Sequence, residues 1–175
     1  MASHSPRKLI GRLTQPQYEL LKSLTDEQAL DATSLDEMVR AAVEDRMMLA
    51  RGLIRAAKVL ANHEDPIVRR SAASRAYYGA YHAARATVFR RYRRDEDDHD
   101  KLPGAVDLAL EGQMTIGDSL KGLRRLRNEM DYSPYPGPDL KQQYAAEEIE
   151  EAIATSLERT EALVDALGRH VGEMR

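Results

Sequence analysis

The residues best suited to chemistry lie in the segment LRRLRNEMDY, from Leu123 to Tyr132. On a helix with 100° between successive residues, Ile116, Leu120 and Met130 share one apolar face, and Arg127 projects between the first two. Burying an unpaired ion costs several kcal/mol, so a guanidinium in that position should meet a carboxylate, a phosphate or a second subunit. Arg127 is therefore the first candidate for binding an anion.

Structural partners are also within reach of this guanidinium. Asp131 lies four residues later, at the spacing of an intrahelical ion pair, and the glutamate-rich segment 139–165 supplies further carboxylates. A binding role and a packing role therefore both stay open for Arg127.

Composition places the chain among globular helical proteins. Its 175 residues are 42% apolar and 31% charged, and a chain of this length can form one domain around a single core. The absence of cysteine excludes disulfides, thiolate metal sites and cysteine nucleophiles. No apolar run approaches the roughly 20 residues of a spanning helix, and residues 1–13 lack a signal-peptide core, so we expect a cytoplasmic protein without a membrane segment.

Charge is segregated along the chain. The net charge is only -3, yet residues 66–94 carry eight arginines and no acid, whereas residues 139–165 are dominated by glutamates. Either oppositely charged helices lie beside each other in one bundle, or the arginines form an anion-binding face. Both interpretations can hold together.

The elements that must position Arg127 are helical. Apolar residues at helical spacing predict an all-α fold, an antiparallel bundle of four long helices and one short helix over residues 34–170. Residues 1–33 are weakly periodic and form a short N-terminal helical extension, in which Pro16 opens a helix. We therefore expect one bundle domain preceded by an extension.

Capping residues predict the first two long helices. Ser34 and Glu37 have the spacing of a capping box for the first helix. Asp65 and Pro66 supply a cap and a first-turn proline for the second, which runs without a breaker to Tyr92.

The later helices are marked in the same way. A short helix is expected over 102–110, and Asp118 is expected to cap the next long helix. That helix should end near Tyr132, because Pro134 follows. The last long helix is predicted from Asp139 onward, with its glutamates facing outward.

The segment SRAYYGAYHAAR (Ser74 to Arg85) has two faces suited to burial. Alanines repeat at helical spacing along one face, and Tyr78, His82 and Phe89 lie along the other. Aromatic and arginine side chains are enriched at interfaces. This helix should therefore lie at the centre of the bundle or at the seam of a dimer.

Two segments, AYYGAYHAAR and LRNEMDY, together resemble the HEPN family (higher eukaryotes and prokaryotes nucleotide-binding). Members carry a tyrosine-rich A-Y-Y-x-x-[FY]-H-A-A helix and a later arginine motif. His99 falls in the turn where many members carry a histidine, and Asp131-Tyr132 matches the ending of one bacterial and archaeal branch. The resemblance covers residues 35–167.

The resemblance implies a helical bundle that dimerises so that two arginine motifs face one cleft. It implies activity as a metal-independent ribonuclease or toxin, and partnership with a small nucleotidyltransferase. In nuclease members the motif reads R-x(4–6)-H, with the arginine stabilising phosphate charge and the histidine helping proton transfer at the 2′-hydroxyl. Here Arg127 and Asn128 match, but Tyr132 occupies the histidine position.

That replacement changes the chemistry. A phenol with a reference pKa of about 10 is a poor general base near neutral pH, so Tyr132 is better suited to donate a hydrogen bond or to pack at an interface. On an ideal helix Arg127 and Tyr132 point about 140° apart, and we expect them to converge only if the helix ends between them.

Two histidines need separate interpretations. His82 could reach a phosphate beside Arg85, act with Arg127 across a dimer cleft, or form a hydrogen-bonded part of the core. His99 lies among acidic residues and is expected in a solvated turn. The histidines show no metal-ligand spacing and there is no glycine-rich phosphate loop, so no metal and no cofactor are expected.

The sequence thus predicts a homodimeric HEPN-type bundle from a toxin–antitoxin-like or nucleotidyltransferase-linked module. Arg127 and Asn128 would hold an RNA or nucleotide phosphate. If RNA is cleaved, we expect metal-independent transesterification, with Arg127 stabilising charge, Tyr132 as a donor and His82 as a further catalytic candidate. The alternative is a noncatalytic interaction or regulatory protein, in which Tyr132 marks the loss of nuclease chemistry.

Overall fold

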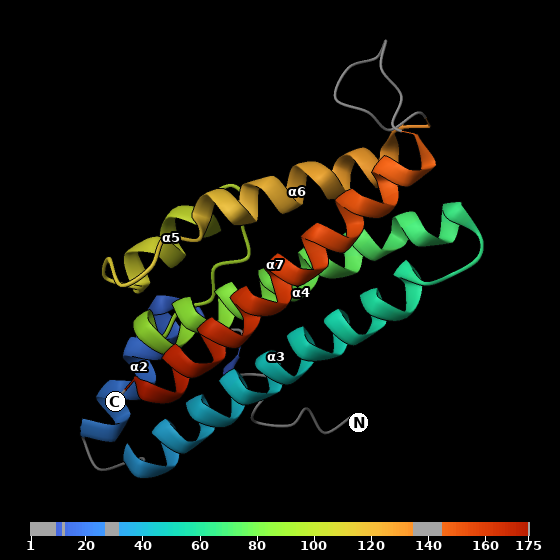
Figure 1. Ribbon diagram of the computed structural model, residues 1–175. Coiled ribbons are helices and arrows are strands. Elements are labelled where there is room, and N and C mark those ends of the chain that lie inside the picture. The colour runs from blue at the N-terminus through green and yellow to red at the C-terminus, as the bar shows by residue number, and fades with distance from the viewer. Residues whose placement is uncertain (1–9, 12, 27–31, 135–144, 175) are drawn as a thin grey trace.

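Six helices are found in the part of the chain that the structure describes (Figure 1). This computed structural model describes residues 10–11, 13–26, 32–134 and 145–174, and no strand occurs in those ranges. The predicted all-α fold, with four long helices and one short helix after an N-terminal helix, is confirmed. The helices are α2 (Gln15–Asp26), α3 (Ala32–Ala61), α4 (Pro66–Tyr92), α5 (Leu102–Ala109), α6 (Gly117–Tyr132) and α7 (Ala146–Glu173).

Helix α4 begins and ends where the sequence predicts. The Asp65 carboxylate accepts a hydrogen bond of 2.8 Å from the Ile67 amide, and Pro66 occupies the first turn. At the other end Arg93 adopts a left-handed conformation (φ 57°), and its amide donates to the Phe89 carbonyl at 2.9 Å. Local capping thus sets the length of the helix that carries the tyrosines.

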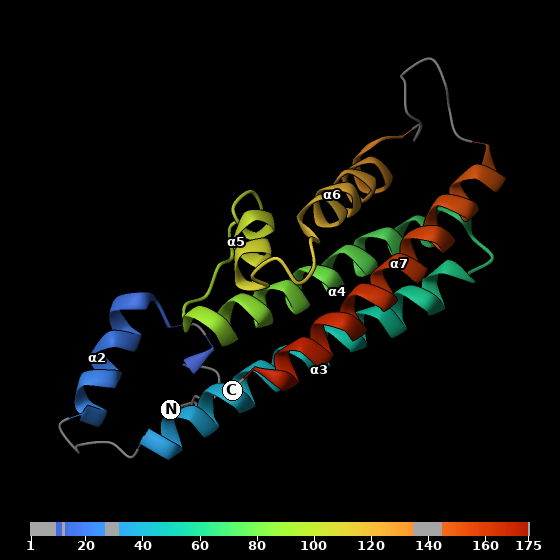
Figure 2. The same ribbon diagram turned by 60° about the vertical axis from the view of Figure 1, so that its left-hand side comes forward.

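The central position predicted for α4 is also confirmed. It packs against α3, α5, α6 and α7, and two views of the ribbon show the other long helices running along it (Figures 1 and 2). Small side chains allow this close packing. A Cβ atom at Gly79 would lie 2.6 Å from Cδ1 of Ile54 and 3.2 Å from the Ala50 carbonyl oxygen, so α3 can approach only because this residue has no side chain.

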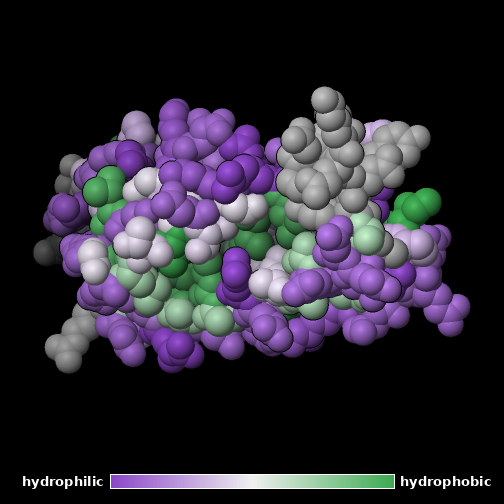
Figure 3. All heavy atoms as spheres, turned by 45° about the horizontal axis from the view of Figure 1, so that its top comes forward, coloured by the Kyte–Doolittle hydropathy of each residue, from purple (hydrophilic) through white to green (hydrophobic). Residues whose placement is uncertain are grey.

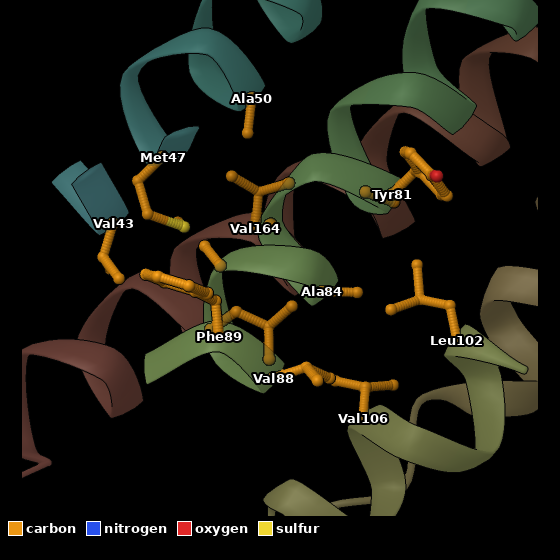
Figure 4. Close-up of a cluster of buried hydrophobic side chains, with 14 of the residues drawn as sticks. Val43, Met47, Ala50, Tyr81, Ala84, Val88, Phe89, Leu102, Val106 and Val164 are labelled. Carbon is orange, nitrogen blue, oxygen red and sulfur yellow. The ribbon is translucent and has the colours of Figure 1, made fainter. Parts of the chain in front are cut away.

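Apolar side chains from several helices meet on α4 (Figure 4). Full burial of each large apolar side chain contributes about 1.5–3 kcal/mol, and this burial holds the surrounding helices against α4. On α6 the predicted apolar face is buried, and Arg127 lies half-buried beside it. The side chains in the close-up include Val43, Met47, Phe89, Leu102, Val106 and Val164.

The cap of α6 differs from the prediction. Asp118 lies in the first turn with its side chain 91% exposed and pairs with Lys121, so it does not cap the helix. Asp107 of α5 does so instead, because its Oδ1 accepts hydrogen bonds from the amides of Ile116 (2.7 Å) and Gly117 (2.9 Å). The carboxylate comes from a neighbouring helix, so local spacing could not identify it.

The starts of α3 and α7 were also predicted. Helix α3 begins at Ala32, upstream of Ser34, so the proposed capping box lies inside the helix. Helix α7 is described from Ala146, and the predicted start at Asp139 lies outside the described residues.

The bundle neutralises several arginines of α4 and of the residue that caps its end. Arg69 pairs with Glu150 of α7, as expected for oppositely charged neighbouring helices. Arg90 and Arg93 both pair with Asp36 of α3. None of the helices in the described part is long and apolar enough to cross a bilayer.

Candidate functional site

The guanidinium of Arg127 contacts two tyrosine rings. Its Cζ atom is 5.7 Å from the ring centroid of Tyr78 on α4 and 4.9 Å from that of Tyr132 at the end of its own helix. Both distances are within the range of cation–π contacts. Arg127 is thereby positioned by rings from two helices.

The polar contacts of Arg127 are with its own helix. Nε lies 3.0 Å from Oδ2 of Asp131, which is the ion pair expected from the sequence spacing. Nε is buried and has no hydrogen-bond partner among the described residues, so its contact with Asp131 is an ion pair without a hydrogen bond. Nη1 donates to Oδ1 of Asn128 at 2.8 Å. Arg127 therefore has a structural partner, but its donors are not all used.

The relation between Arg127 and Tyr132 corrects one expectation. We expected the two side chains to meet only if the helix ended between them, yet α6 continues through Tyr132 and they are in contact. The Cβ atoms of the two residues point in different directions, but the arginine side chain is long enough to reach the tyrosine ring. Tyr132 is 70% exposed, so its ring offers a free face beside the guanidinium.

An aromatic cluster, consisting of Tyr77, Tyr78, Tyr81 and His99, lies next to Arg127. The ring of His99 stacks on Tyr81 with 4.4 Å between centroids and meets Tyr78 edge-on at 6.3 Å. The Tyr77 hydroxyl is 2.5 Å from Nδ1 of His99. The hydroxyl of Tyr81 donates to the Asp97 carbonyl at 2.7 Å, which holds the connection between α4 and α5 against the cluster.

His99 lies in a turn, as predicted, but the turn is not solvated on the side of this ring. The ring is half-buried against three tyrosines, although acidic residues surround it in the sequence. One of these acids stabilises the turn, because the Asp98 carboxylate accepts a hydrogen bond of 2.8 Å from the Asp100 amide. The family resemblance had pointed to a histidine in this turn, and the packing of the turn on α4 places His99 beside the candidate site.

Charges from two helices act on the aromatic cluster. Burial, opposed by Arg124 and Arg127, raises the pKa of Tyr77 to about 12, so its phenol stays protonated at any ordinary pH. Burial, together with Arg124, Arg127 and Arg85, lowers the pKa of His99. The imidazole is therefore largely neutral near pH 7 and has cationic neighbours on two sides.

His82 faces a different part of the molecule. It lines a groove of about 730 Å³ with Arg46, Arg85 and Asp95. Burial, reinforced by Arg85 and Arg46, lowers its pKa to about 4. Nδ1 is buried without a hydrogen-bond partner among the described residues, so the interpretation as a hydrogen-bonded core histidine is not supported at that nitrogen.

Two further surface features flank the candidate site. A hollow of about 330 Å³ beside Tyr132 is lined by residues that include Ile67, Arg70 and Pro134. A larger groove of about 750 Å³ lies between α6 and α7, where Leu126 and other residues line it. The space-filling view shows an apolar hollow between hydrophilic ridges on this face (Figure 3).

Comparison of the chain with protein-family models, curated proteins and solved structures gives no match. The function must therefore be argued from the site. Within the described ranges no group of three or more histidine, aspartate or glutamate side chains is arranged to hold a metal ion. What the site offers is two arginines, a neutral imidazole, buried phenols and one exposed phenol, a set suited to binding an anion and moving a proton.

Proposed function

We propose that this chain is a HEPN-like RNA-binding protein, which holds an RNA or nucleotide phosphate at Arg127 and cleaves the RNA without a metal ion. The main support is the contact of the Arg127 guanidinium with the rings of both Tyr78 and Tyr132. It also draws on the tyrosine-rich segment and the arginine motif, which resemble that family.

The geometry suits a phosphodiester better than an isolated anion. Arg127 and Arg124 supply positive charge, and the exposed ring of Tyr132 supplies a surface on which a base can stack. The hollow beside Tyr132 offers room next to that ring. Asn128 is exposed and accepts a hydrogen bond from Arg127, so it orients the guanidinium.

In the proposed reaction Arg127 stabilises the charge that develops on the phosphate during attack by the 2′-hydroxyl. Asp131 restrains the guanidinium in the free protein, and a phosphate takes its place as the stronger partner when RNA binds. Tyr132 donates a hydrogen bond to a phosphate oxygen. The product is a 2′,3′-cyclic phosphate, and a chelator does not slow its formation.

We further propose that the chain acts as a homodimer whose two Arg127 residues face one cleft, in a toxin–antitoxin-like module with a nucleotidyltransferase-type partner. The α6–α7 groove, which joins apolar residues to charges of both signs, is the surface best suited to a second protein. Sedimentation analysis of the purified chain tests this part, and a monomer at micromolar concentration would contradict it.

Binding of a fluorescein-labelled single-stranded RNA, followed by anisotropy, tests the proposed site. Removal of a charge-assisted contact costs about 1.5–3 kcal/mol, so Arg127→Ala should weaken binding roughly 10- to 100-fold. It should also lower the slope of log Kd against log salt by about 1. Lys121→Ala is the control, because Lys121 is an exposed cation of the same helix that pairs with Asp118 and does not line the α6–α7 groove. Equal losses in both variants would reject Arg127 as the site.

A second candidate function is a noncatalytic interaction or regulatory protein. The observation in its favour is the Arg127–Asp131 ion pair, which already partners the guanidinium without any ligand. In that case Arg127→Ala lowers the melting temperature and leaves RNA binding unchanged. Binding without formation of a cyclic phosphate instead favours a nucleic-acid-binding protein that has lost nuclease activity.

A further inference from the structure

His99 and Arg127 lie against the same tyrosine ring. The ring of His99 lies against Tyr81 and Tyr78, and the guanidinium of Arg127 contacts the same Tyr78 ring from α6. The histidine comes from the α4–α5 connection and the arginine from α6, so the two meet only through the fold. One phosphodiester beside Tyr78 would have both groups as neighbours.

One nitrogen of His99 has a defined partner. Nδ1 is hydrogen-bonded to the Tyr77 hydroxyl at 2.5 Å. The residue as a whole is half-buried, so part of the side chain reaches the surface. An imidazole that is held at one nitrogen and partly exposed is the arrangement of a positioned general base or acid.

Every element around His99 contributes a charge or a titratable group. Tyr77, Tyr78, Tyr81 and Arg85 face it from α4, and Arg124 and Arg127 face it from α6. Its own connection supplies Asp100, which pairs with Arg124. Burial, together with these cations, lowers the pKa of His99, and a bound phosphate would offset the cations and favour the protonated imidazole.

We propose that His99 is the proton-transfer residue of this site and that Tyr77 is its positioning residue, an inference that rests on the proposed function. Nε2 of the neutral imidazole takes the proton of the 2′-hydroxyl as the 2′-oxygen forms its bond to phosphorus. The bond from phosphorus to the 5′-oxygen breaks, and the resulting imidazolium returns the proton to that oxygen. The Tyr77 hydroxyl accepts from Nδ1–H and holds the ring in place.

His82 and Tyr132 are less suited to this role. His82 meets Tyr81 edge-on but faces the groove formed with Arg46 and Asp95. Tyr132 contacts Arg127 but is a phenol. His82→Gln is therefore a matched control for His99→Gln, since each removes one half-buried histidine that contacts Tyr81.

The first test follows the histidine ring signals by NMR while uridine 3′-monophosphate is added. The signal of His99 should shift and its pKa should rise on binding, and the signal of His82 should not. Both effects should disappear in Arg127→Ala. If the probe binds in a manner that depends on Arg127 but leaves His99 unmoved, the inference about His99 is overturned and the proposed function stands. If neither this probe nor RNA binds, the proposed function itself fails.

The second test measures cleavage of a DNA oligomer that contains a single ribonucleotide. Loss of a general base lowers rates by about 10²- to 10⁴-fold, so His99→Gln should lose kcat to that extent while Kd for the oligomer changes less than about threefold. Tyr77→Phe should lower kcat less and shift the acidic limb of the pH profile, which a purely structural change would leave in place. Full activity in His99→Gln, or RNA binding by the wild type without any cleavage, overturns the inference.

Discussion

Replacement of Asp95 by asparagine should cost more stability than any other isosteric change of a carboxylate near the site. Asp95 lies just after α4 and accepts hydrogen bonds from Arg46 Nη1 at 2.7 Å and Arg85 Nε at 3.0 Å, and a further one from Arg85 Nη2. The three side chains are only 13–15% exposed. Arg46 also donates to the Gly11 carbonyl at 2.6 Å, so the same carboxylate indirectly holds the N-terminal segment.

The magnitude follows from what Asp95→Asn leaves behind. The change keeps the volume but leaves two largely buried guanidinium groups without an anion, and breaking a buried ion pair costs about 3–5 kcal/mol. Because some solvent reaches the group, we expect the lower end, about 3 kcal/mol. At roughly 2–4 °C per kcal/mol for a chain of this size, the melting temperature should fall by about 6–12 °C.

The same carboxylate gives a pH dependence with a definite sign. Burial alone would raise the pKa of Asp95, but hydrogen bonds and charges from Arg85 and Arg46 lower it overall from 3.8. Its contribution to stability is therefore complete above pH 3.8 and is lost as the pH falls through the lower, folded-state value. In Asp95→Asn, the loss of stability below pH 3.8 should therefore be smaller than in the wild type.

Urea unfolding followed by circular dichroism measures the free energy directly. Asp118→Asn is the control, because its side chain is 91% exposed and its ion pair with Lys121 should contribute less than about 1 kcal/mol. A loss for Asp95→Asn that is no larger than that of the control, at an unchanged m-value, would refute the argument that the buried carboxylate stabilises the fold.

Three further predictions concern the helices and His82. Asp107→Ala should destabilise the protein by about 1–2 kcal/mol, because two amides of α6 lose their acceptor, whereas Asp118→Ala should cost less than about 0.5 kcal/mol. Thermal melts that reverse this order would contradict the observed cap. Gly79→Ala should cost about 1–3 kcal/mol despite the higher helix propensity of alanine, because the new methyl group meets Ile54. Adding Ile54→Val to this variant should recover part of the loss. If urea unfolding shows that the two changes simply add, the proposed contact between residues 54 and 79 is ruled out. Because folding lowers the pKa of His82 from 6.5 to about 4, the free energy of unfolding should decrease as the pH drops through this interval. His82→Gln should flatten the dependence of stability on pH in the same interval. An unaltered dependence in this variant would show that another group is responsible.

The sequence was most informative where the cause of a structure is local. Asp65 and Pro66 predicted the start of α4 because the cap and the first turn are adjacent in the chain. The apolar face of α6 was also predicted, since helical spacing alone decides which residues share a face. The ion pair of Arg127 with Asp131 was one of the expected alternatives for the same reason.

Prediction failed where one segment supplies a group to another. The cap of α6 comes from Asp107 on α5, which is why the nearer Asp118 was wrongly chosen. His99 was assigned to solvent because its neighbours in the chain are acidic, whereas its neighbours in space are tyrosines. The contact of Arg127 with Tyr132 was missed because Cβ directions ignore the reach of a long side chain.

The aromatic cluster also makes the protein its own optical reporter. The chain contains no tryptophan, so its intrinsic ultraviolet emission comes from eight tyrosines. Four of them, Tyr77, Tyr78, Tyr81 and Tyr132, surround the imidazole and guanidinium of the candidate site. Any guest that enters there should alter the quenching of half of the fluorophores, so occupancy can be followed on the unlabelled molecule.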